Sequence, residues 1–411
     1  METKINKPEL MAPAGNWTML RAAVKNGADA VYFGIGKLNM RAKAENFTID
    51  ELSEINQFCI ENNVLPFLVV NTIIRGEKIS DVDVILLAAK DAGIKKIICW
   101  DFAVIEKCKE LGLEFCISTQ ASIANVSAAK FYQSLGASRV VLARECSLEE
   151  ISEIKKNIDI EVEAFIHGAM CVAVSGRCFL SHEMFGRSAN EGECLQTCRR
   201  EFEIYDKRMN QSYLVGEDYV LSAKDLSTID FIDKLIEAGI DSFKIEGRKR
   251  SPEYVAKSVS VYRKAIDAYF DGTLTEDLKK YFNQELSTVY NRGFSSGFYN
   301  YDPSTNEFTG AEGNVSTIKK EYVGKVINYY TNSKIVYVEL ESGQVSVGDK
   351  ILIMGKTSGV IELELRKIIV EENEVSSVSK GERFTTECDE KVRPRDRVFI
   401  LKDISDQKSK I

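Results

Sequence analysis

The sequence predicts an α/β protein, with a (β/α)8 barrel of the TIM type followed by a small antiparallel β-barrel. Between residue 9 and about residue 270, eight short apolar runs alternate with helical patterns, which matches such a barrel in count and length. From residue 322 to residue 401, valines and isoleucines recur at alternating positions between turn signals, as in antiparallel strands. A doubly wound open sheet is the alternative for the first unit.

The eight apolar runs are continuous, which is typical of strands that are buried on both faces. They span Glu9–Ala14, Ala30–Ile35, Pro66–Asn71, Lys96–Trp100, Glu114–Thr119, Arg139–Arg144, Glu161–Gly168 and Ser242–Gly247. Helical patterns separate them, for example over residues 16–26, 49–62 and 81–92. Several predicted helices are followed by a glycine that can adopt the left-handed conformation ending a helix: Gly27, Gly93, Gly136 and Gly239.

The connection between the seventh and eighth runs is abnormally long. It holds more than seventy residues, whereas a whole βα step needs about thirty. We therefore predict a cysteine-rich insertion over residues 169–225, with a hairpin that pairs Glu201–Tyr205 with Tyr213–Leu221. The expected units are a barrel with its insertion over 1–272, an extension over 273–319 and a small β-barrel over 320–405.

Composition restricts the class of protein. The 411 residues are 44% hydrophobic, and 54 Lys and Arg stand against 62 Asp and Glu, giving a net charge of −8. Bulk basicity therefore cannot drive binding to nucleic acid, although a local basic patch can. The chain shows no apolar run suited to a signal peptide or a membrane span, so we expect a cytoplasmic protein that does not enter a membrane. In that reducing compartment, clustered cysteines favour metal binding over disulfides.

Four of the ten cysteines lie within 28 residues, with the spacing C-x6-C-x15-C-x3-C. They are Cys171, Cys178, Cys194 and Cys198, and both histidines, His167 and His182, lie in or beside the same segment. Four thiolates are the ligand set of a structural zinc or of an iron–sulfur cluster. The spacing lacks the paired CxxC of a zinc ribbon, which favours iron–sulfur, while four buried cysteines without metal are the alternative. Of the others, Cys146 could reach the barrel mouth, and the remaining five are expected to be buried.

The insertion leaves the carboxyl end of the seventh strand, the face where barrel active sites lie. Polar residues after the other strands should ring the same mouth: Asn71, Asp101, Gln120, Arg144, Glu145, His167, Glu246 and Arg248. Among them His167, Glu246 and Arg248 are candidates for catalytic roles. Ordinary polar groups at strand ends are the alternative interpretation for each.

Cations gather near the same face. The run Lys244–Arg250 carries four of them, and Arg199 and Arg200 follow the last clustered cysteine. Arg144, Lys244 and Arg199 are therefore candidates for binding a phosphate or a small carboxylate, which arginine can hold bidentately. A solvated charged face is the alternative. Glycines after the first two strands, Gly15, Gly34 and Gly36, could admit a ligand to the backbone or could serve turns.

Two segments resemble the signature of the collagenase-like peptidase U32 family. They are His167–Ser181, with the sequence HGAMCVAVSGRCFLS, and Asn190–Arg199, with the sequence NEGECLQTCR. Residues 9–15, 222–225, 244–248 and 291–294 are also similar to that family, so the resemblance covers essentially the whole chain.

The resemblance implies a barrel-like catalytic domain, and several family members are iron–sulfur proteins that hydroxylate without molecular oxygen. One branch makes 5-hydroxyuridine at the wobble position of tRNA with prephenate as the hydroxyl source, and others act on ribosomal RNA or on the ubiquinone ring. The C-terminal β-barrel is similar to the second domain of translation elongation factors and looks most like the tRNA branch. By this resemblance Cys171, Cys178, Cys194 and Cys198 become ligands of a cluster, expected to be 4Fe–4S with zinc as the alternative; Cys198 is the least secure.

The expected function is RNA modification, with tRNA and a small carboxylate co-substrate as partners and a paralogous subunit as a further one. A peptidase is the first alternative. The chain has no HExxH helix, because its two histidines lie fifteen residues apart, but His167 could serve Cys171 or Ser175 as a base. A hydroxylase of ribosomal RNA or a non-enzymatic RNA-binding protein is the second alternative.

Overall fold

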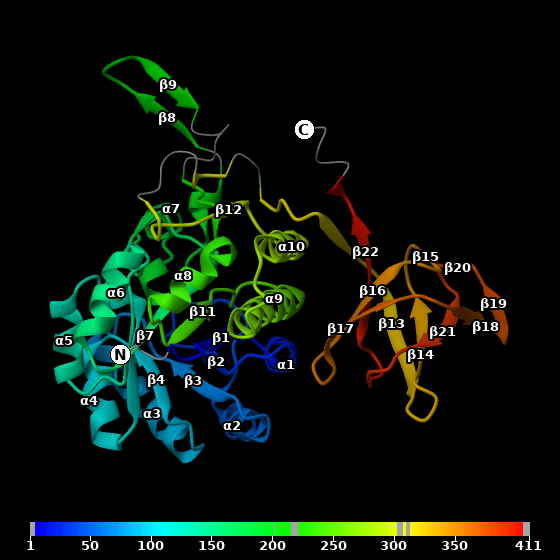
Figure 1. The fold of residues 1–411 in the computed structure, drawn as a ribbon, viewed down its shortest axis with the longest axis horizontal. Coiled ribbons are helices and arrows are strands. Elements are labelled where there is room, and N and C mark those ends of the chain that lie inside the picture. The colour runs from blue at the N-terminus through cyan, green and yellow to red at the C-terminus, as the bar shows by residue number, and fades with distance from the viewer. Residues whose placement is uncertain (1–4, 201, 215–220, 302–306, 310–312, 406–411) are drawn as a thin grey trace.

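The computed structural model describes residues 5–200, 202–214, 221–301, 307–309 and 313–405. Its larger part is a closed barrel of eight parallel strands (Figure 1). The strands are β1 (Glu9–Pro13), β2 (Ala30–Phe33), β3 (Leu65–Val69), β4 (Lys96–Cys99), β5 (Glu114–Ile117), β6 (Arg139–Val141), β7 (Glu161–Ala169) and β11 (Ser242–Ile245). The barrel closes because β11 pairs in parallel with both β7 and β1. All eight predicted strands are confirmed, and the open sheet is excluded.

Helices alternate with these strands and cover the outside of the barrel. They are α1 (Trp17–Lys25), α2 (Leu52–Glu61), α3 (Ile79–Asp91), α4 (Phe102–Leu111), α5 (Val126–Ser134), α6 (Leu148–Asn157), α8 (Ile232–Glu237) and α9 (Pro252–Phe270), with α10 (Glu276–Ser287) packed on α9. Gly27, Gly93, Gly136 and Gly239 all have positive φ, as expected for glycines that end helices. In the described part of the chain, no helix is both long and apolar enough to cross a membrane.

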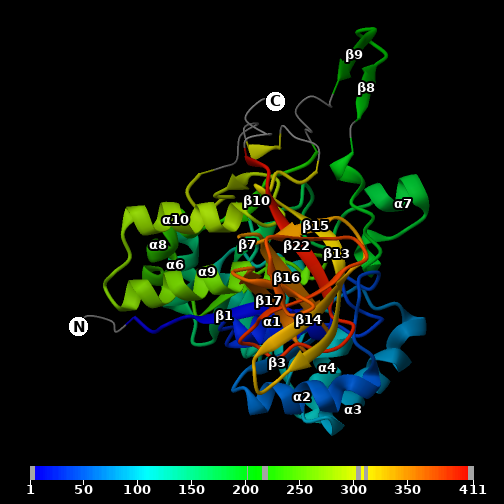
Figure 2. The same ribbon diagram turned by 90° about the vertical axis from the view of Figure 1, so that its right-hand side faces the viewer.

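The insertion begins where β7 ends. It contains α7 (Leu180–Phe185), the antiparallel hairpin of β8 (Glu203–Asp206) and β9 (Gln211–Leu214), and β10 (Asp225–Ser227), which returns antiparallel to β7. The hairpin is confirmed with shorter strands, while Glu201 and residues 215–220 of the expectation lie outside the described residues. Figures 1 and 2 both show the hairpin projecting from the body of the protein. The strand β12 (Phe294–Ser295) then pairs with β10.

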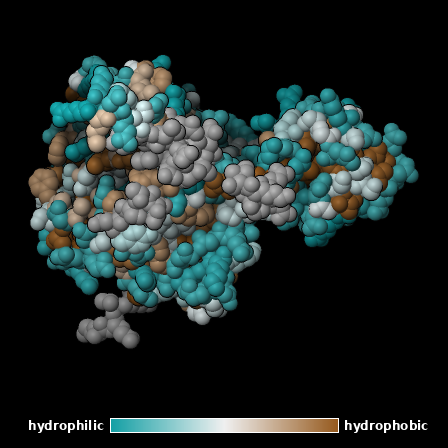
Figure 3. Space-filling view, turned by 90° about the horizontal axis from the view of Figure 1, so that it is seen from above, coloured by the Kyte–Doolittle hydropathy of each residue, from teal (hydrophilic) through white to brown (hydrophobic). Residues whose placement is uncertain are grey.

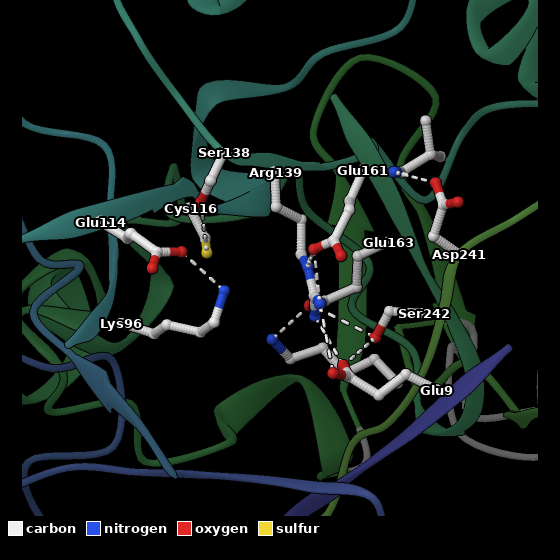
Figure 4. A network of polar contacts seen from close by, with 12 residues as sticks. Glu9, Lys96, Glu114, Cys116, Ser138, Arg139, Glu161, Glu163, Asp241 and Ser242 are labelled. Atoms are coloured by element: carbon white, nitrogen blue, oxygen red, sulfur yellow. Dashed lines mark hydrogen bonds and ion pairs between the residues drawn. The ribbon is translucent and has the colours of Figure 1, made fainter. Parts of the chain in front are cut away.

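A network of charged side chains fills the amino-terminal end of the barrel (Figure 4). Arg139, at the start of β6, pairs with Glu9 at 2.7 Å, with Glu161 at 2.7 Å and with Glu163 at 2.8 Å. Glu163 also accepts a hydrogen bond of 2.6 Å from Lys244 on β11. Because Lys244 lies further toward the carboxyl ends of the strands and lines the cavity described below, the network joins the two ends of the barrel.

The C-terminal unit is an antiparallel sheet around its own apolar core. Its strands are β13 (Ile318–Tyr330), β14 (Ile335–Leu340), β16 (Lys350–Gly355), β17 (Gly359–Glu364), β18 (Ile368–Val370), β19 (Asn373–Val375), β21 (Arg383–Glu387) and β22 (Arg397–Asp403), and β15 (Gln344–Ser346) pairs with β20 (Ser377–Ser379). A small apolar cluster joins this unit to the barrel: Ala22 of α1 packs with Leu352, Val360 and Phe399. The expected antiparallel unit is confirmed.

Candidate functional site

The four clustered cysteines line a single cavity of about 140 Å³ at the carboxyl ends of the barrel strands. Residues from the strand ends line the same cavity, namely Asn71, Gln120, Arg144, Lys244, Glu246 and Arg248. Most of the polar residues predicted to surround the barrel mouth therefore lie together in this cavity, and residues of the insertion line it as well.

Hydrogen bonds and ion pairs hold the cysteine-bearing loops in place. The backbone N–H of Cys178 donates to Asn190 Oδ1 at 2.9 Å. Glu191 pairs with Arg75 at 2.6 Å and with Lys78 at 2.7 Å, which clamps the insertion to the loop after β3. Gly192 has a φ of +87°, and a Cβ there would lie 2.1 Å from the carbonyl oxygen of Asn39. Glycine is therefore required where the insertion meets the loop after β2.

The clustered cysteines differ from the other six in exposure. Cys171 is exposed and Cys178, Cys194 and Cys198 are half-buried, whereas the remaining cysteines, Cys146 included, are buried. Burial raises the pKa of the Cys198 thiol, Arg199 opposes the rise, and the neighbouring charges of Cys171, Cys194 and Cys178 add to it. The backbone N–H of Gln196 donates to Cys194 Sγ at 3.4 Å. The four thiols thus share one electrostatic environment beside a cation.

The four cysteines are not drawn together around one point in the described structure. Among the described residues, no three His, Cys, Asp or Glu side chains converge closely enough to hold one metal ion. A tetrahedral zinc needs its ligands within about 2.3 Å of one centre. A 4Fe–4S cluster has several irons, so its four thiolates bind at separate points around a common cavity. Four cysteines on one cavity are the donor set that either group uses, so the residues present fit an iron–sulfur cluster, with zinc as the alternative.

Glu246 is the carboxylate of the cavity and is held by partners on β2 and the loop after it. Its Oε1 pairs with Arg41 Nη2 at 2.8 Å, and Tyr32 Oη donates to its Oε2 at 3.3 Å. Although burial opposes ionisation, Arg41, Arg144 and Arg248 lower the pKa of Glu246 to about 2. Glu246 is thus a fixed anion. Arg41 was not predicted as a site residue, because no motif marks it. The unusually long loop after the second strand, in which Arg41 lies, was the one feature of the sequence that could have indicated it.

Two arginines of the cavity keep hydrogen-bonding capacity. Arg248 Nη2 donates to Asn39 Oδ1 at 2.9 Å and to Asn46 Oδ1 at 2.5 Å, and burial lowers the pKa of Arg248 to about 10. Arg144 Nη1 donates to the carbonyl of Ala169 at 2.8 Å. In both residues the buried Nε–H has no partner in the described structure. An unmet charged donor is costly, so these groups favour an anionic ligand.

His167 does not join the ring that the sequence predicts. The pairing of β7 with β11 shifts between Lys244 and Ile245, so that His167 faces outward beside Ile245. Its ring packs against Tyr254 and Tyr262 of α9, with centroids 5.7 and 5.4 Å away. Burial and the charge of Arg250 lower the pKa of His167 to about 3. The expected place of His167 at the mouth is therefore wrong, because a β-bulge interrupts the alternation of inward and outward side chains.

Arg199 also lies outside the cavity lining, and its guanidinium is occupied. It donates to the carbonyl of Ala223 at 2.8 Å, to Ser222 Oγ at 3.0 Å and to the carbonyl of Met170. Arg199 therefore braces the two ends of the insertion, which corrects its expected role in substrate binding.

The basic run does not form a free surface, and two ring members besides His167 are absent from the lining. Within the run, Arg250 pairs with Asp225 at 2.7 Å, and Lys249 Nζ donates to the carbonyl of Cys194 at 2.7 Å. Lys244 and Arg248 are its members in the cavity wall. Asp101 instead caps α4 by accepting from the N–H of Ala103, and Glu145 is exposed outside the cavity.

Gly34, after β2, makes room for the chain's own side chains. A Cβ there would lie 2.6 Å from Asn39 Cγ and 2.7 Å from Arg248 Nη2. Gly34→Ala should therefore displace Arg248 and lower the free energy of unfolding by about 1–3 kcal/mol. Gly36→Ala is the matched control, because a Cβ at Gly36 would meet no atom within 4 Å. Urea denaturation measures both variants, and equal stabilities would contradict this packing role.

The fold and the site together define a class of protein: a TIM-type barrel whose mouth is roofed by a four-cysteine insertion and lined by arginines. The model of peptidase family U32 matches residues 15–309 of the chain. The chain belongs to this family.

Three curated relatives carry different names. The chain is 41% identical over 407 residues to a collagenase of Porphyromonas gingivalis, which covers 96% of this chain and 98% of that protein. It is 41% identical over 339 residues to tRNA hydroxylation protein P1 of Bacillus subtilis, covering 81% of this chain and 80% of that protein. It is 33% identical over 307 residues to a 23S rRNA 5-hydroxycytidine synthase of Escherichia coli, covering 73% of this chain and 46% of that protein.

Proposed function

We propose that this protein is an RNA-modifying enzyme that hydroxylates the wobble uridine of tRNA at carbon 5 of the base, with prephenate as the hydroxyl source. Relatives named for tRNA hydroxylation and for 5-hydroxycytidine synthesis in ribosomal RNA support RNA hydroxylation. The observation that carries the proposal is the cavity itself, in which four cysteines face Arg144, Lys244 and Arg248.

In this proposal Cys171, Cys178, Cys194 and Cys198 hold a 4Fe–4S cluster. When bound, such a cluster supplies electron transfer, or a Lewis-acidic iron if one iron lacks a protein ligand. The chain offsets the negative charge of the thiolates with Arg199 and Lys249 beside them.

The cations of the cavity hold the small carboxylate. Arg144 and Arg248 line the cavity with part of their donor capacity unmet, and a carboxylate is the acceptor that a guanidinium binds best. Lys244 is already paired with Glu163, so it offers no free contact to the carboxylate. Prephenate has two carboxylates, which suits two separate arginines.

The cavity wall also offers amide groups for the base. Asn71 Nδ2 donates to Gln120 Oε1 at 3.1 Å and to Ser118 Oγ at 3.0 Å. These contacts fix the Gln120 oxygen as an acceptor, so its Nε2 group is left to donate. An amide N–H can donate to the ring carbonyls of uracil, and the base must leave its stack to reach the cavity.

A peptidase is the second candidate, because the relatives named collagenase are as similar to this chain as the RNA-modifying ones. A thiol or hydroxyl peptidase needs a base beside its nucleophile. His167, the base considered for Cys171 or Ser175, lies outside the cavity and is held neutral by burial. Purified protein that cleaves gelatin or casein, with Cys171→Ala protein inactive, would favour this candidate over RNA modification.

Deletion of the gene tests the proposed function. Bulk tRNA from the deletion strain should lose 5-hydroxyuridine and the wobble modifications derived from it, and a plasmid copy should restore them. Mass spectrometry of nucleosides from digested tRNA measures the loss. Unchanged tRNA nucleosides, together with loss of a hydroxylated nucleoside from ribosomal RNA, would move the substrate to the ribosome. Unchanged nucleosides in both RNAs would reject RNA modification.

The colour of the protein tests the cluster independently of the substrate. Protein purified without oxygen should be brown, because iron–sulfur clusters absorb visible light and zinc does not. A colourless protein that still binds tRNA would favour the non-enzymatic RNA-binding alternative.

A further inference from the structure

Exposed hydrophobic side chains concentrate on the insertion. Of the 23 exposed large hydrophobic residues in the described chain, eight lie between residues 172 and 209. Six of these eight precede the hairpin, and we call them the apolar lip: Val172, Val174, Phe179, Met184, Phe185 and Leu195. Soluble proteins leave such groups exposed together mainly where something binds.

The apolar lip is continuous with the wall of the cavity. Val172 and Val174 line the cavity and are 40% and 46% exposed. Phe179 follows Cys178 and precedes Leu180, which both line the cavity, and its own ring is 65% exposed. Figure 3 looks down on the upper face of Figure 1 and shows brown hydrophobic groups scattered among teal hydrophilic ones there. Part of the apolar lip therefore borders the cavity.

Exposed arginines lie beside the apolar lip, and their charge indicates which kind of ligand the lip binds. Arg177, Arg187 and Arg200 are exposed, and the guanidinium of Arg200 lies 4.8 Å from the ring centroid of Phe185. Of the nearby carboxylates, Glu191 and Glu193 pair with cations of the barrel loops and with Arg187, and Glu183 of α7 is exposed, so the arginines outnumber the carboxylates left over. Exposed aromatic rings with arginines beside them are the surface that binds unpaired nucleotides, because bases stack on the rings and phosphates pair with the cations.

We propose that the apolar lip binds the unpaired nucleotides on either side of the target base, with bases stacked on Phe179 and Phe185 and phosphates near Arg177 and Arg200. The proposal rests on the proposed function, because it assumes an RNA substrate. A base that leaves its stack to enter the cavity deprives its neighbours of a stacking partner. The lip replaces that partner at the entrance and so holds the loop open.

A binding experiment with full-length protein tests the lip without relying on activity. The probe is a short hairpin RNA with 2-aminopurine in its loop, a base whose fluorescence falls when it stacks. The double variant Phe179→Ala, Phe185→Ala should bind this loop at least about 30-fold more weakly, because it removes two rings on which bases stack. Phe179→Trp, Phe185→Trp should bind as tightly as the unaltered protein.

Phe131→Ala is the matched control, because Phe131 is 54% exposed on α5, outside the lip. It should leave the affinity unchanged, and a blunt duplex RNA should not distinguish the variants. Equal affinity of the double variant and Phe131→Ala for the loop would overturn the proposal. A dimer that dissociates in the double variant, seen by light scattering, would also overturn it by assigning the lip to a protein partner such as a paralogous subunit. If the double variant binds the loop as tightly as the unaltered protein while tRNA is still modified in the cell, the proposal for the lip fails and the proposed function stands.

Discussion

Under the proposed function, Cys171→Ser should yield protein without iron and reduce tRNA hydroxylation by more than about 100-fold. Loss of an outer contact to a metal ligand already costs about 10–100-fold in metal affinity or activity, so loss of a ligand should cost more. Cys171 is the exposed member of the four cysteines that line the cavity. Its replacement should therefore leave the barrel folded. Iron and acid-labile sulfide per chain, measured on anaerobic protein, and nucleoside mass spectrometry of tRNA from complemented deletion strains report the two effects.

Cys388→Ser is the control for this experiment. Its thiol is buried in the C-terminal unit and donates to the carbonyl of Glu390 at 3.1 Å, a bond that serine can keep. Iron content and tRNA modification should be unchanged. Serine variants of Cys178, Cys194 and Cys198 should behave like Cys171→Ser, and Cys198 is the informative case because the resemblance leaves it least secure. Full iron content in Cys171→Ser protein would contradict the assignment of the four ligands.

The barrel could be predicted from the sequence because its signals are local. A continuous run such as Pro66–Asn71 marks a strand that is buried on both faces, and Gly93 marks the end of the helix after it. Eight repeats of this pattern leave few topologies to consider. The short strands β18 (Ile368–Val370) and β19 (Asn373–Val375) carry too few residues for any periodicity to show.

The candidate site could be predicted in part, and the failures have physical causes. Residues at strand ends converge because parallel strands end at one face, so Asn71, Arg144 and Glu246 were brought together as expected. His167 was misplaced because a β-bulge turns its side chain outward, and nothing in a single sequence marks that shift. The role of Arg199 depends on which carbonyls the folded insertion presents to it, which spacing does not reveal.

Glu163→Gln should lower the free energy of unfolding by about 3–5 kcal/mol, the cost of breaking a buried ion pair. Glu163 is fully buried and neutralises both Lys244 at 2.6 Å and Arg139 at 2.8 Å. Its replacement leaves Lys244 in the cavity floor without its ion pair. Urea unfolding followed by tryptophan fluorescence measures this loss, because both tryptophans, Trp17 and Trp100, lie in the barrel.

Glu161→Gln provides the matched control, because Glu161 pairs with the same Arg139 at 2.7 Å but is half-exposed. A pair of that kind contributes at most about 1 kcal/mol to the free energy of unfolding.

The pH dependence of the free energy of unfolding separates the contribution of the Glu163 charge from that of its packing. Although burial opposes ionisation, Lys244 and Arg139 lower the pKa of Glu163. The stabilisation by the Glu163 charge is therefore fully present above the ordinary glutamate pKa of roughly 4.3 and is lost as the pH falls through the lower pKa of the folded state. The difference in stability between the unaltered protein and Glu163→Gln should accordingly be constant above that value and narrow below it. A difference that persisted unchanged in acid would mean that Glu163 stabilises the barrel by its shape and hydrogen bonds rather than by its charge.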